Sequence, residues 1–377
     1  MVYLNTIITG MALFPIVAAL FTMPYALFQY HRHGAVSKYR SMIIYSFILY
    51  MMIAFLMTVL PLPSLESTAG NDWHDHLNLI PCMQIYLYWQ DKSFSAIAFI
   101  EYLKSYSFWQ LAFNVLLTVP FGIYLRYYFR QGFKNTLLFS FLLSLFYEIT
   151  QFSSLWSIYP GPYRLADVED LICNTLGGVI GYVIGYLFVR ILPGRDRIDQ
   201  TARRSSMVVT GSRRFWAVSF DVLCCILLHQ FIVMAAEMFV PGFFVDGIIS
   251  FWSMFCLMSI LQIIVFKGAT LGHAICRITL VSTDGRRPAA GQIVKRYVML
   301  WLFLEAPAII LHLIPFGEMN LIKSVLVLVL YLLIPFYVYW YFINIVCLRG
   351  ERILPHDRIS GTTYIAVGSK VQKTENK

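Results

Sequence analysis

Residues 41–60 read SMIIYSFILYMMIAFLMTVL, a run of 20 residues without a single charged side chain. About 20 apolar residues in an α-helix cross the roughly 30 Å of hydrocarbon in a bilayer. The backbone in such a run must be helical, because unpaired N–H and C=O groups are too costly in lipid. The stretch therefore predicts a transmembrane helix.

Similar apolar blocks recur along the whole chain. Of its 377 residues, 59% are hydrophobic and only 13% are charged, against roughly 25% charged residues in a soluble domain. We therefore expect an all-α, polytopic integral membrane protein with about nine transmembrane helices. The predicted spans are 4–28, 41–60, 107–125, 136–155, 168–189, 215–240, 246–266, 297–315 and 323–347.

The distribution of basic residues predicts the orientation of these spans. If the loop 31–40 is cytoplasmic, the inside segments hold 25 of the 29 lysines and arginines. Basic residues accumulate on the cytoplasmic side of membrane proteins, so we expect the N-terminus outside and the C-terminus in the cytoplasm. This asymmetry accounts for the net charge of +9 without nucleic acid, and it suits contacts with anionic lipid headgroups.

A basic linker divides the chain into two dissimilar bundles. The segment 191–212 is polar, basic and interrupted by Pro and Gly, which is typical of a connection between domains. We expect a five-helix domain at 1–190, a four-helix domain at 213–366 and a polar tail at 367–377. The two bundles show no internal repeat, which disfavours an inverted-repeat transporter.

The longest predicted outside segment is 61–106. It is long enough for an amphipathic helix on the membrane surface, and Phe94–Tyr106 is the best candidate. The seven cysteines form no disulfide framework, and only Cys82 is expected outside. No metal-binding spacing, catalytic motif or nucleotide fingerprint is present, so we expect no metal, no cofactor and no catalytic residue.

The densest group of polar residues within the predicted spans lies between residues 148 and 185. Glu148 and Gln151 are three residues apart and share one helix face. The residues Arg164, Asp167, Asp170 and Asn174 would share one stripe if their segment were helical. A ladder of small residues follows at Gly177, Gly178, Gly181 and Gly185, a pattern that lets membrane helices approach closely.

Two interpretations of this cluster remain open. In the first, Arg164 pairs with Asp167 and Asn174 bridges helices, so that the cluster only holds the bundle together. In the second, the cluster is a ligand or substrate site near the outer surface, because ionisable groups in a membrane are costly unless they are paired or wetted. The acidic residues Glu148, Asp167, Glu169 and Asp170 outnumber the one nearby arginine, and this excess suits proton or cation handling.

At these residues the sequence resembles the VanZ-like family over about 40–190. The matching elements are Asn78-Leu-Ile-Pro, Asn114-Val-Leu-Leu-Thr-Val-Pro-Phe-Gly, Glu148-xx-Gln and Arg164-xx-Asp-xx-Asp-xxx-Asn-Thr-x-Gly-Gly. The family is named for a protein associated with resistance to the glycopeptide teicoplanin. The resemblance implies a bacterial cytoplasmic membrane protein of the cell envelope, with Glu148, Gln151, Arg164, Asp167, Asp170 and Asn174 as its functional candidates.

The second half is similar to the RDD family of membrane proteins over about 213–366. The similarity rests on Arg214 and Asp221, on the run from Lys267 through Gly272-His273 and Asp284-Gly285 to Arg296, and on His356-Asp357-Arg358. The family's name records one arginine and two aspartates, for which Arg214, Asp221 and Asp246 are the candidates. Some members have been linked to cation/proton exchange, which implies a role for Asp221 and also for Glu305 in the eighth span. An ion pair between Asp221 and Arg214 that only anchors the helix is the structural alternative.

The sequence leaves three functions open. The first is a non-enzymatic envelope protein whose outward-facing polar cluster contacts envelope lipid, lipid-linked wall precursor or glycopeptide and affects teicoplanin susceptibility. The second is a cation/proton exchanger or small-molecule transporter that uses intramembrane carboxylates. The third is a lipid-modifying membrane enzyme in which a carboxylate pair acts as general acid and base. The expected partners are membrane lipids, and no signal for an oligomeric state is present.

Overall fold

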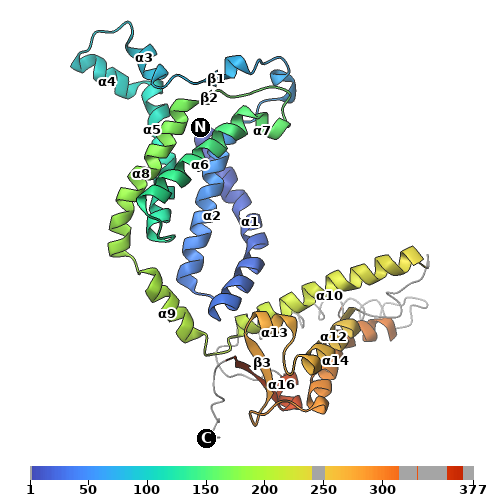
Figure 1. The fold of residues 1–377 in the computed structure, drawn as a ribbon. Helices are drawn as coiled ribbons and strands as arrows, with labels where there is room; N and C mark the ends of the chain where they lie inside the picture. The colour runs from blue at the N-terminus through green and yellow to red at the C-terminus, as the bar shows by residue number, and fades with distance from the viewer. Residues whose placement is uncertain (1, 240–250, 314–328, 330–354, 368–377) are drawn as a thin grey trace. The chain divides into compact units, whose positions relative to one another are not determined.

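The computed structural model describes residues 2–239, 251–313, 329 and 355–367. The described chain is dominated by helices, with two short sheets of two strands each (Figure 1). It divides into two compact units. Unit 1 consists of Met1–Leu20 and Ser37–Ile198, and unit 2 consists of Phe21–Val36 and Asp199–Lys377.

Unit 1 contains four long helices after the first part of α1 (Val2–His33): α2 (Lys38–Val59), α5 (Tyr106–Tyr127), α6 (Phe133–Phe152) and α8 (Val168–Ile191). Two 3₁₀ turns (Leu65–Thr68 and His74–His76), α3 (Met83–Trp89) and α4 (Ala96–Lys104) lie between α2 and α5 in the sequence. The short turn α7 (Ser154–Ser157) follows α6. The strands β1 (Leu77–Asn78) and β2 (Ala166–Asp167) pair in parallel at the same end of this unit as α3 and α4.

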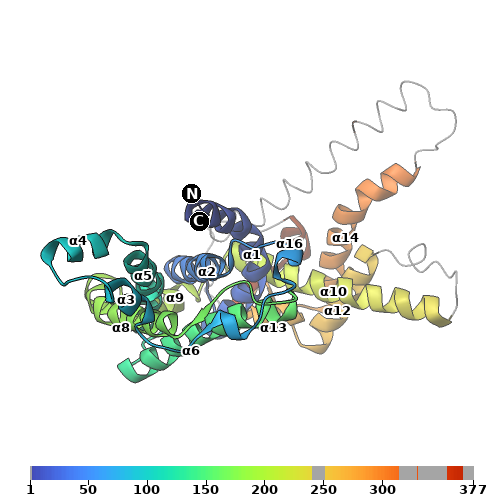
Figure 2. The same cartoon turned by 90° about the horizontal axis from the view of Figure 1, so that it is seen from above.

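Unit 2 contains α10 (Gly211–Phe239), α12 (Phe251–Val265), α13 (Leu271–Ile275), α14 (Ala290–Leu313) and α16 (Pro355–Ser360) (Figure 2). The segment predicted as a linker contains the helix α9 (Arg195–Ser205). The strands β3 (Ile278–Ser282) and β4 (Thr362–Ala366) form an antiparallel pair in which Ile278 lies opposite Ala366. The prediction of an all-α chain is confirmed in part: the described chain is mostly helical, but it also contains two pairs of short strands.

Five described helices are long and apolar enough to cross a membrane: Asn5–His33, Lys38–Val59, Tyr106–Tyr127, Val168–Ile191 and Gly211–Phe239. These correspond to five of the nine predicted spans and identify a multi-pass membrane protein. The prediction at 136–155 falls on a helix, α6, which is not one of the five. The span 246–266 is described only from residue 251, where α12 begins, and 323–347 lies outside the described residues except for Val329.

Close packing of α8 against α5 and α6 positions the polar residues of unit 1. A Cβ atom on Gly177 or Gly181 would collide with the carbonyl oxygen of Val115 or Val119 on α5. A Cβ on Gly178 would collide with the side chain of Ser140 on α6. Each glycine therefore allows a backbone contact that any larger residue would prevent, and the predicted small-residue ladder is confirmed as a packing surface.

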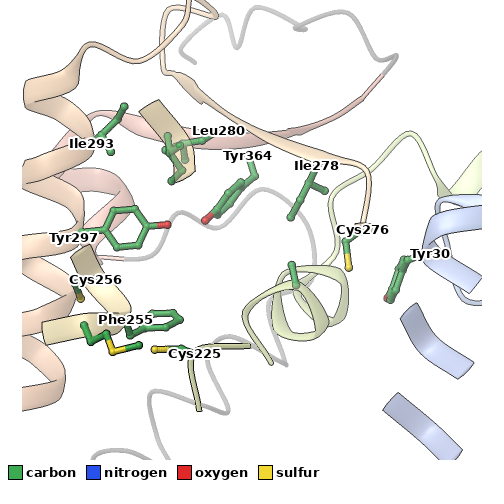
Figure 3. Packing of buried hydrophobic residues seen from close by; sticks show 13 residues of the cluster. Tyr30, Cys225, Phe255, Cys256, Cys276, Ile278, Leu280, Ile293, Tyr297 and Tyr364 are labelled. Carbon is green, nitrogen blue, oxygen red and sulfur yellow. The ribbon is translucent and has the colours of Figure 1, made fainter. Parts of the chain in front are cut away.

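Unit 2 has a hydrophobic core that joins the β3–β4 pair to its helices. Figure 3 shows Ile278 and Leu280 of β3 beside Tyr364 of β4, with Tyr297 of α14 and Phe255 of α12 in the same cluster. Ile278 and Leu280 are each 1% exposed. The strand pair is therefore an integral part of the core and not a surface addition.

Candidate functional site

Asp167 is the centre of the hydrogen-bond network in unit 1. It is the N-cap of α8, and its Oδ1 accepts hydrogen bonds from the backbone N–H of Glu169 at 2.8 Å and from Nδ2 of Asn78 at 3.0 Å. Its Oδ2 accepts from Nε2 of Gln84 at 3.3 Å. The backbone N–H of Asp167 in turn donates to Oε2 of Glu148 at 3.0 Å. An N-cap carboxylate satisfies otherwise unpaired N–H groups at the start of the helix.

Part of the segment 61–106, predicted to lie outside, is held to this centre by backbone and side-chain contacts. The parallel bridge between β1 and β2 places Asn78 opposite Asp167. The backbone N–H of Gln84, at the start of α3, donates to Oε2 of Glu169 at 3.3 Å. Asp167 and Glu169 are 3% and 4% exposed. Both therefore fasten residues 77–84 over the end of α8.

A second layer of polar side chains lies one turn deeper along α8. Nδ2 of Asn114 on α5 donates to Oδ1 of Asp170. Nδ2 of Asn174 donates to Oγ of Ser144 on α6 at 3.1 Å, and Oγ1 of Thr118 donates to the carbonyl of Asn174 at 2.6 Å. Oδ1 of Asn174 is buried without a hydrogen-bond partner. These side chains connect α5, α6 and α8 inside the bundle.

Arg164 and Gln151 bind the end of α2 instead of a carboxylate. The guanidinium of Arg164 donates to the carbonyl oxygens of Thr58 at 2.5 Å and Leu60 at 2.9 Å. Nε2 of Gln151 also donates to the carbonyl of Thr58, at 2.7 Å. A cation at a helix C-terminus is favourable, because the last carbonyl groups have no intrahelical partner. Arg164 therefore caps α2.

The structure brings all six predicted residues of unit 1 to one region but changes the geometry expected for two of them. Arg164 and Asp167 precede α8, which begins at Val168, so they do not share its helical stripe. The ion pair between Arg164 and Asp167 that the structural alternative invoked is also absent from the residues that the structure describes. We refer to Glu148, Gln151, Arg164, Asp167, Glu169, Asp170 and Asn174 as the polar cluster.

In the part of the chain that the structure describes, Arg164 lies near the acidic residues of the polar cluster but forms no ion pair with them. Within residues 2–239, none of Glu148, Asp167, Glu169 and Asp170 lies in an ion pair. Hydrogen bonds from neutral groups satisfy Asp167 and Glu169, which are buried. Glu148 and Asp170 are only half-buried, so they are the carboxylates that a bound group could reach.

Sequence reasoning missed Gln84, Thr118 and Ser144 in this network. Ser144 belongs to a buried polar stripe on α6 formed by Thr136, Ser140, Ser144, Tyr147 and Gln151. Spacings of three and four residues place such side chains on one helix face. The same spacing that paired Glu148 with Gln151 would have found this stripe. No spacing in the sequence points to Gln84, because it reaches the site through the parallel pairing of β1 and β2, two segments far apart in the chain.

An apolar groove of about 420 Å³ lies between α2 and α6. Its walls are formed by Phe47, Ile48, Met51, Met52 and Phe55 of α2 and by Leu143, Phe146 and Tyr147 of α6. The hydroxyl of Tyr147 is buried and has no hydrogen-bond partner. Tyr147 directly precedes Glu148 in α6, and Phe55 lies one turn before Thr58 in α2. The groove and the polar cluster are therefore formed by neighbouring turns of the same two helices.

In unit 2, Arg214 does not bind Asp221 as the structural alternative expected. Its NH1 instead lies 3.3 Å from Oδ2 of Asp357, and the other oxygen of Asp357 accepts from Arg296. Arg296 also donates to Oγ1 of Thr362 at 3.1 Å and to the hydroxyl of Tyr364 at 2.9 Å. Asp357 is fully buried. One carboxylate therefore bridges two guanidinium groups and fastens α16 and β4 to α10 and α14.

Asp221 caps a short helix. Its Oδ1 accepts from the backbone N–H of Gly272 at 2.7 Å, and its Oδ2 accepts from the hydroxyl of Thr270 at 2.5 Å. Thr270 and His273 form a reciprocal capping box at the start of α13. The imidazole of His273 accepts through Nδ1, and burial lowers its pKa to about 3. It is therefore neutral.

Arg213, which the sequence analysis did not single out, is buried more deeply than Arg214. Its guanidinium donates to the carbonyl oxygens of Ser206 at 2.8 Å, Cys276 at 2.6 Å and Arg277 at 2.7 Å. It fastens the chain before α10 to the segment after α13. The side chain of Glu305, within α14, and the whole of Asp246 lie outside the described residues.

Comparison with known protein families agrees with this division. Residues 47–189 match the VanZ/LLP1 family model, and residues 208–361 match the RDD family model. No curated protein and no solved structure matched the chain. The first match contains all six predicted residues of the polar cluster, and the second contains Arg214, Asp221, Arg296 and Asp357. The chain is therefore a membrane protein in which a VanZ-like domain is followed by an RDD domain.

Proposed function

We propose that the chain is a non-enzymatic protein of the bacterial cytoplasmic membrane whose polar cluster binds the head of an envelope lipid, a lipid-linked wall precursor or a glycopeptide. Binding there would alter susceptibility to glycopeptides such as teicoplanin. The match to the VanZ/LLP1 family supports a membrane protein of the cell envelope. The choice of ligand rests on the chemistry of the polar cluster.

The observation that carries the proposal is the absence of ion pairs from the acidic residues of the polar cluster in the described part of unit 1. Arg164 is occupied by the carbonyl oxygens of Thr58 and Leu60. Carboxylates that are not held in an ion pair favour a ligand that brings N–H, O–H or ammonium donors, because hydrogen bonds to charged groups are the strong ones. Sugars, peptides and amines present such donors.

The groove between α2 and α6 supports a ligand with a hydrocarbon chain. Its volume of about 420 Å³ falls in the range of about 300–1,000 Å³ typical of small-molecule sites. Its lining is almost wholly apolar, and its last lining residue on α6, Tyr147, is adjacent in the sequence to Glu148. A lipid-linked molecule would place its chain in the groove and its polar head against Glu148 and Asp170.

The proposal includes the predicted orientation, with the polar cluster at the outer side and nine spans in total. The apolar surface of α6 supports its assignment as a span. Its large side chains point outward at Leu137, Leu138, Phe139, Phe141, Leu142, Phe146 and Ile149, each about 40% to 50% exposed. A helix with an apolar exterior and a polar interior stripe is expected where lipid is the solvent.

The test uses a glycopeptide-susceptible bacterium that expresses the chain. We expect expression to change the inhibitory concentration of teicoplanin, and Glu148→Gln or Asp170→Asn to return it to the value of the empty vector. Loss of one charge-assisted hydrogen bond should weaken ligand binding by about tenfold or more. Glu101→Gln, an exposed carboxylate on α4, is the matched control. If both cluster variants reach the membrane in normal amounts and keep the phenotype, the polar cluster is structural and the proposal fails.

A further inference from the structure

A second pocket lies in unit 2, at the junction of α12 and α14. It has a volume of about 200 Å³ and is lined by Ile263, Ile264, Lys267, Gly268, Arg287, Pro288, Ala290 and Ile293. The helices α12 and α14 pack side by side (Figure 1). The pocket therefore combines a hydrophobic floor with two basic side chains.

The two basic residues have no acidic partner. Among the described residues, no carboxylate forms an ion pair with Lys267 or Arg287, whereas the neighbouring Arg286 lies 4.0 Å from Asp284. Lys267 and Arg287 are both exposed, but they converge on one cavity from different segments of the chain. Two convergent positive charges without a counter-charge favour an anionic ligand.

Hydrogen bonds hold the backbone around the pocket in place. Gly268 donates its N–H to the carbonyl of Ile263 at 2.8 Å, which closes the C-terminus of α12. The carbonyl of Gly268 accepts from the N–H of Leu280 and the hydroxyl of Thr279 on β3. Ala290, the first residue of α14, lines the opposite side. The first turn of a helix has N–H groups without intrahelical partners, which add to the positive potential.

Lys267 occupies a backbone conformation that favours glycine. Its φ is +57°, in the left-handed region where a side chain is disfavoured. The helix end would form more readily with glycine at this position. Lysine is less favourable than glycine in this conformation, so Lys267→Gly removes the charge without a cost to folding.

Apolar side chains surround the basic pocket on the outside. Ile264, Val265 and Phe266 at the end of α12 are 50%, 67% and 56% exposed, and Val294 and Val298 on α14 are 43% and 42% exposed. This surface suits the hydrocarbon of a bilayer. A ligand that bridges it and the two cations must carry both an anionic head and an apolar chain.

We propose that this pocket binds the phosphate of an anionic membrane lipid. The phosphate oxygens contact the ammonium of Lys267, the guanidinium of Arg287 and the N-terminus of α14. The acyl chains lie along Ile264, Phe266 and Val294. Arg287 provides a planar pair of donors for the phosphate, and Lys267 provides a point charge. The site is separate from the polar cluster and does not depend on its proposed function.

The test is a titration of the full-length protein in a non-ionic detergent with short-chain phosphatidylglycerol. Each basic residue near a membrane surface contributes about fivefold in affinity for anionic lipid. We therefore expect Lys267→Gly and Arg287→Gln each to weaken binding about fivefold, and the double variant about 25-fold. Lys267→Gly should fold well because glycine suits its backbone. Arg286→Gln, which removes the same charge one residue away, should bind as the native chain does.

Three other results of the titration would contradict the proposal. Equal weakening by Arg286→Gln would mean that binding follows overall charge, and the site would be refuted. Equal binding of phosphatidylcholine with the same chains would refute recognition of an anion. Inorganic phosphate that bound as tightly as the lipid would show that a soluble phosphate, and not a membrane lipid, is the ligand.

Discussion

At the scale of single residues, buried carboxylates have three different roles in this protein. Asp167 and Asp221 cap the starts of helices, and Asp357 forms ion pairs with two guanidinium groups. Glu148 and Asp170 do neither, and both are half-buried. Each accepts one hydrogen bond from a neutral group, the backbone N–H of Asp167 for Glu148 and Nδ2 of Asn114 for Asp170, and has further acceptor capacity for a ligand. These two residues are therefore the best targets for mutagenesis.

The buried histidines of unit 2 predict how its stability depends on pH. Burial lowers the pKa of His273 to about 3. Burial and the guanidinium groups of Arg296 and Arg214 lower the pKa of His356 well below its usual value. The folded protein therefore keeps both imidazoles neutral, while the unfolded chain takes up protons near pH 6.5. Stability is complete above that pH and falls below it, by about 1.4 kcal/mol per pH unit for each histidine.

Thermal unfolding in detergent between about pH 7.5 and about pH 4.5 measures this dependence. The double variant His273→Gln, His356→Gln lacks both titrating groups, so its unfolding temperature should decline less on acidification than that of the native chain. An equally steep decline in the double variant would contradict the assignment and would point to carboxylates as the titrating groups.

At the scale of elements, α8 depends on its glycines for its position against α5. A methyl group on Gly181 would collide with the carbonyl oxygen of Val119 and lie 3.1 Å from Cα of Gly122. Both atoms belong to backbone and cannot rotate away. The steric conflict should outweigh the gain of about 1 kcal/mol that alanine brings to a helix.

We expect Gly181→Ala to destabilise unit 1 by about 1–3 kcal/mol, measured as a lower unfolding temperature of the purified protein. Gly194→Ala is the control, because nothing lies within 4 Å of an added Cβ there; its effect should stay within about 0.5 kcal/mol. Unchanged stability of Gly181→Ala would mean that α5 and α8 separate more easily than their packing indicates.

The amphipathic helix predicted around Phe94–Tyr106 falls at α4, whose bounds are Ala96–Lys104. Ile97 and Ile100 are 73% and 53% exposed, while Ala98 and Tyr102 are buried. The length and composition of this stretch were sufficient to predict the helix. They were not sufficient to find α3 or the bridge between β1 and β2, because two-residue strands have no periodicity and depend on a partner about 90 residues away.

At the scale of the whole molecule, the charge asymmetry predicts which end of each unit faces the outside. We expect an impermeant maleimide to label Asp91→Cys on intact cells and to label Arg204→Cys only after the membrane is opened. Both positions are exposed. The reporters are placed in a Cys82→Ser background, because Cys82 is itself exposed. Labelling in the reverse pattern would invert the topology and remove the case for an outward-facing site.

The sequence by itself determined the membrane class and the two families. Apolar runs of about 20 residues have one favourable structure in lipid, so local composition was enough for the five spanning helices. The spacing of Glu148, Gln151 and the residues from Arg164 to Asn174 also carried the family resemblance. These features depend on residues close together in the chain.

Only the tertiary structure decided which partner each polar residue takes. Arg164 binds the carbonyl oxygens of α2 and not Asp167, and Arg214 binds Asp357 and not Asp221. Lys267 and Arg287 line one pocket although 19 positions separate them. A charged side chain has several possible partners of similar strength, and the backbone positions that choose among them come from packing over long sequence separations. Composition and spacing therefore specify the helices, while packing specifies the sites.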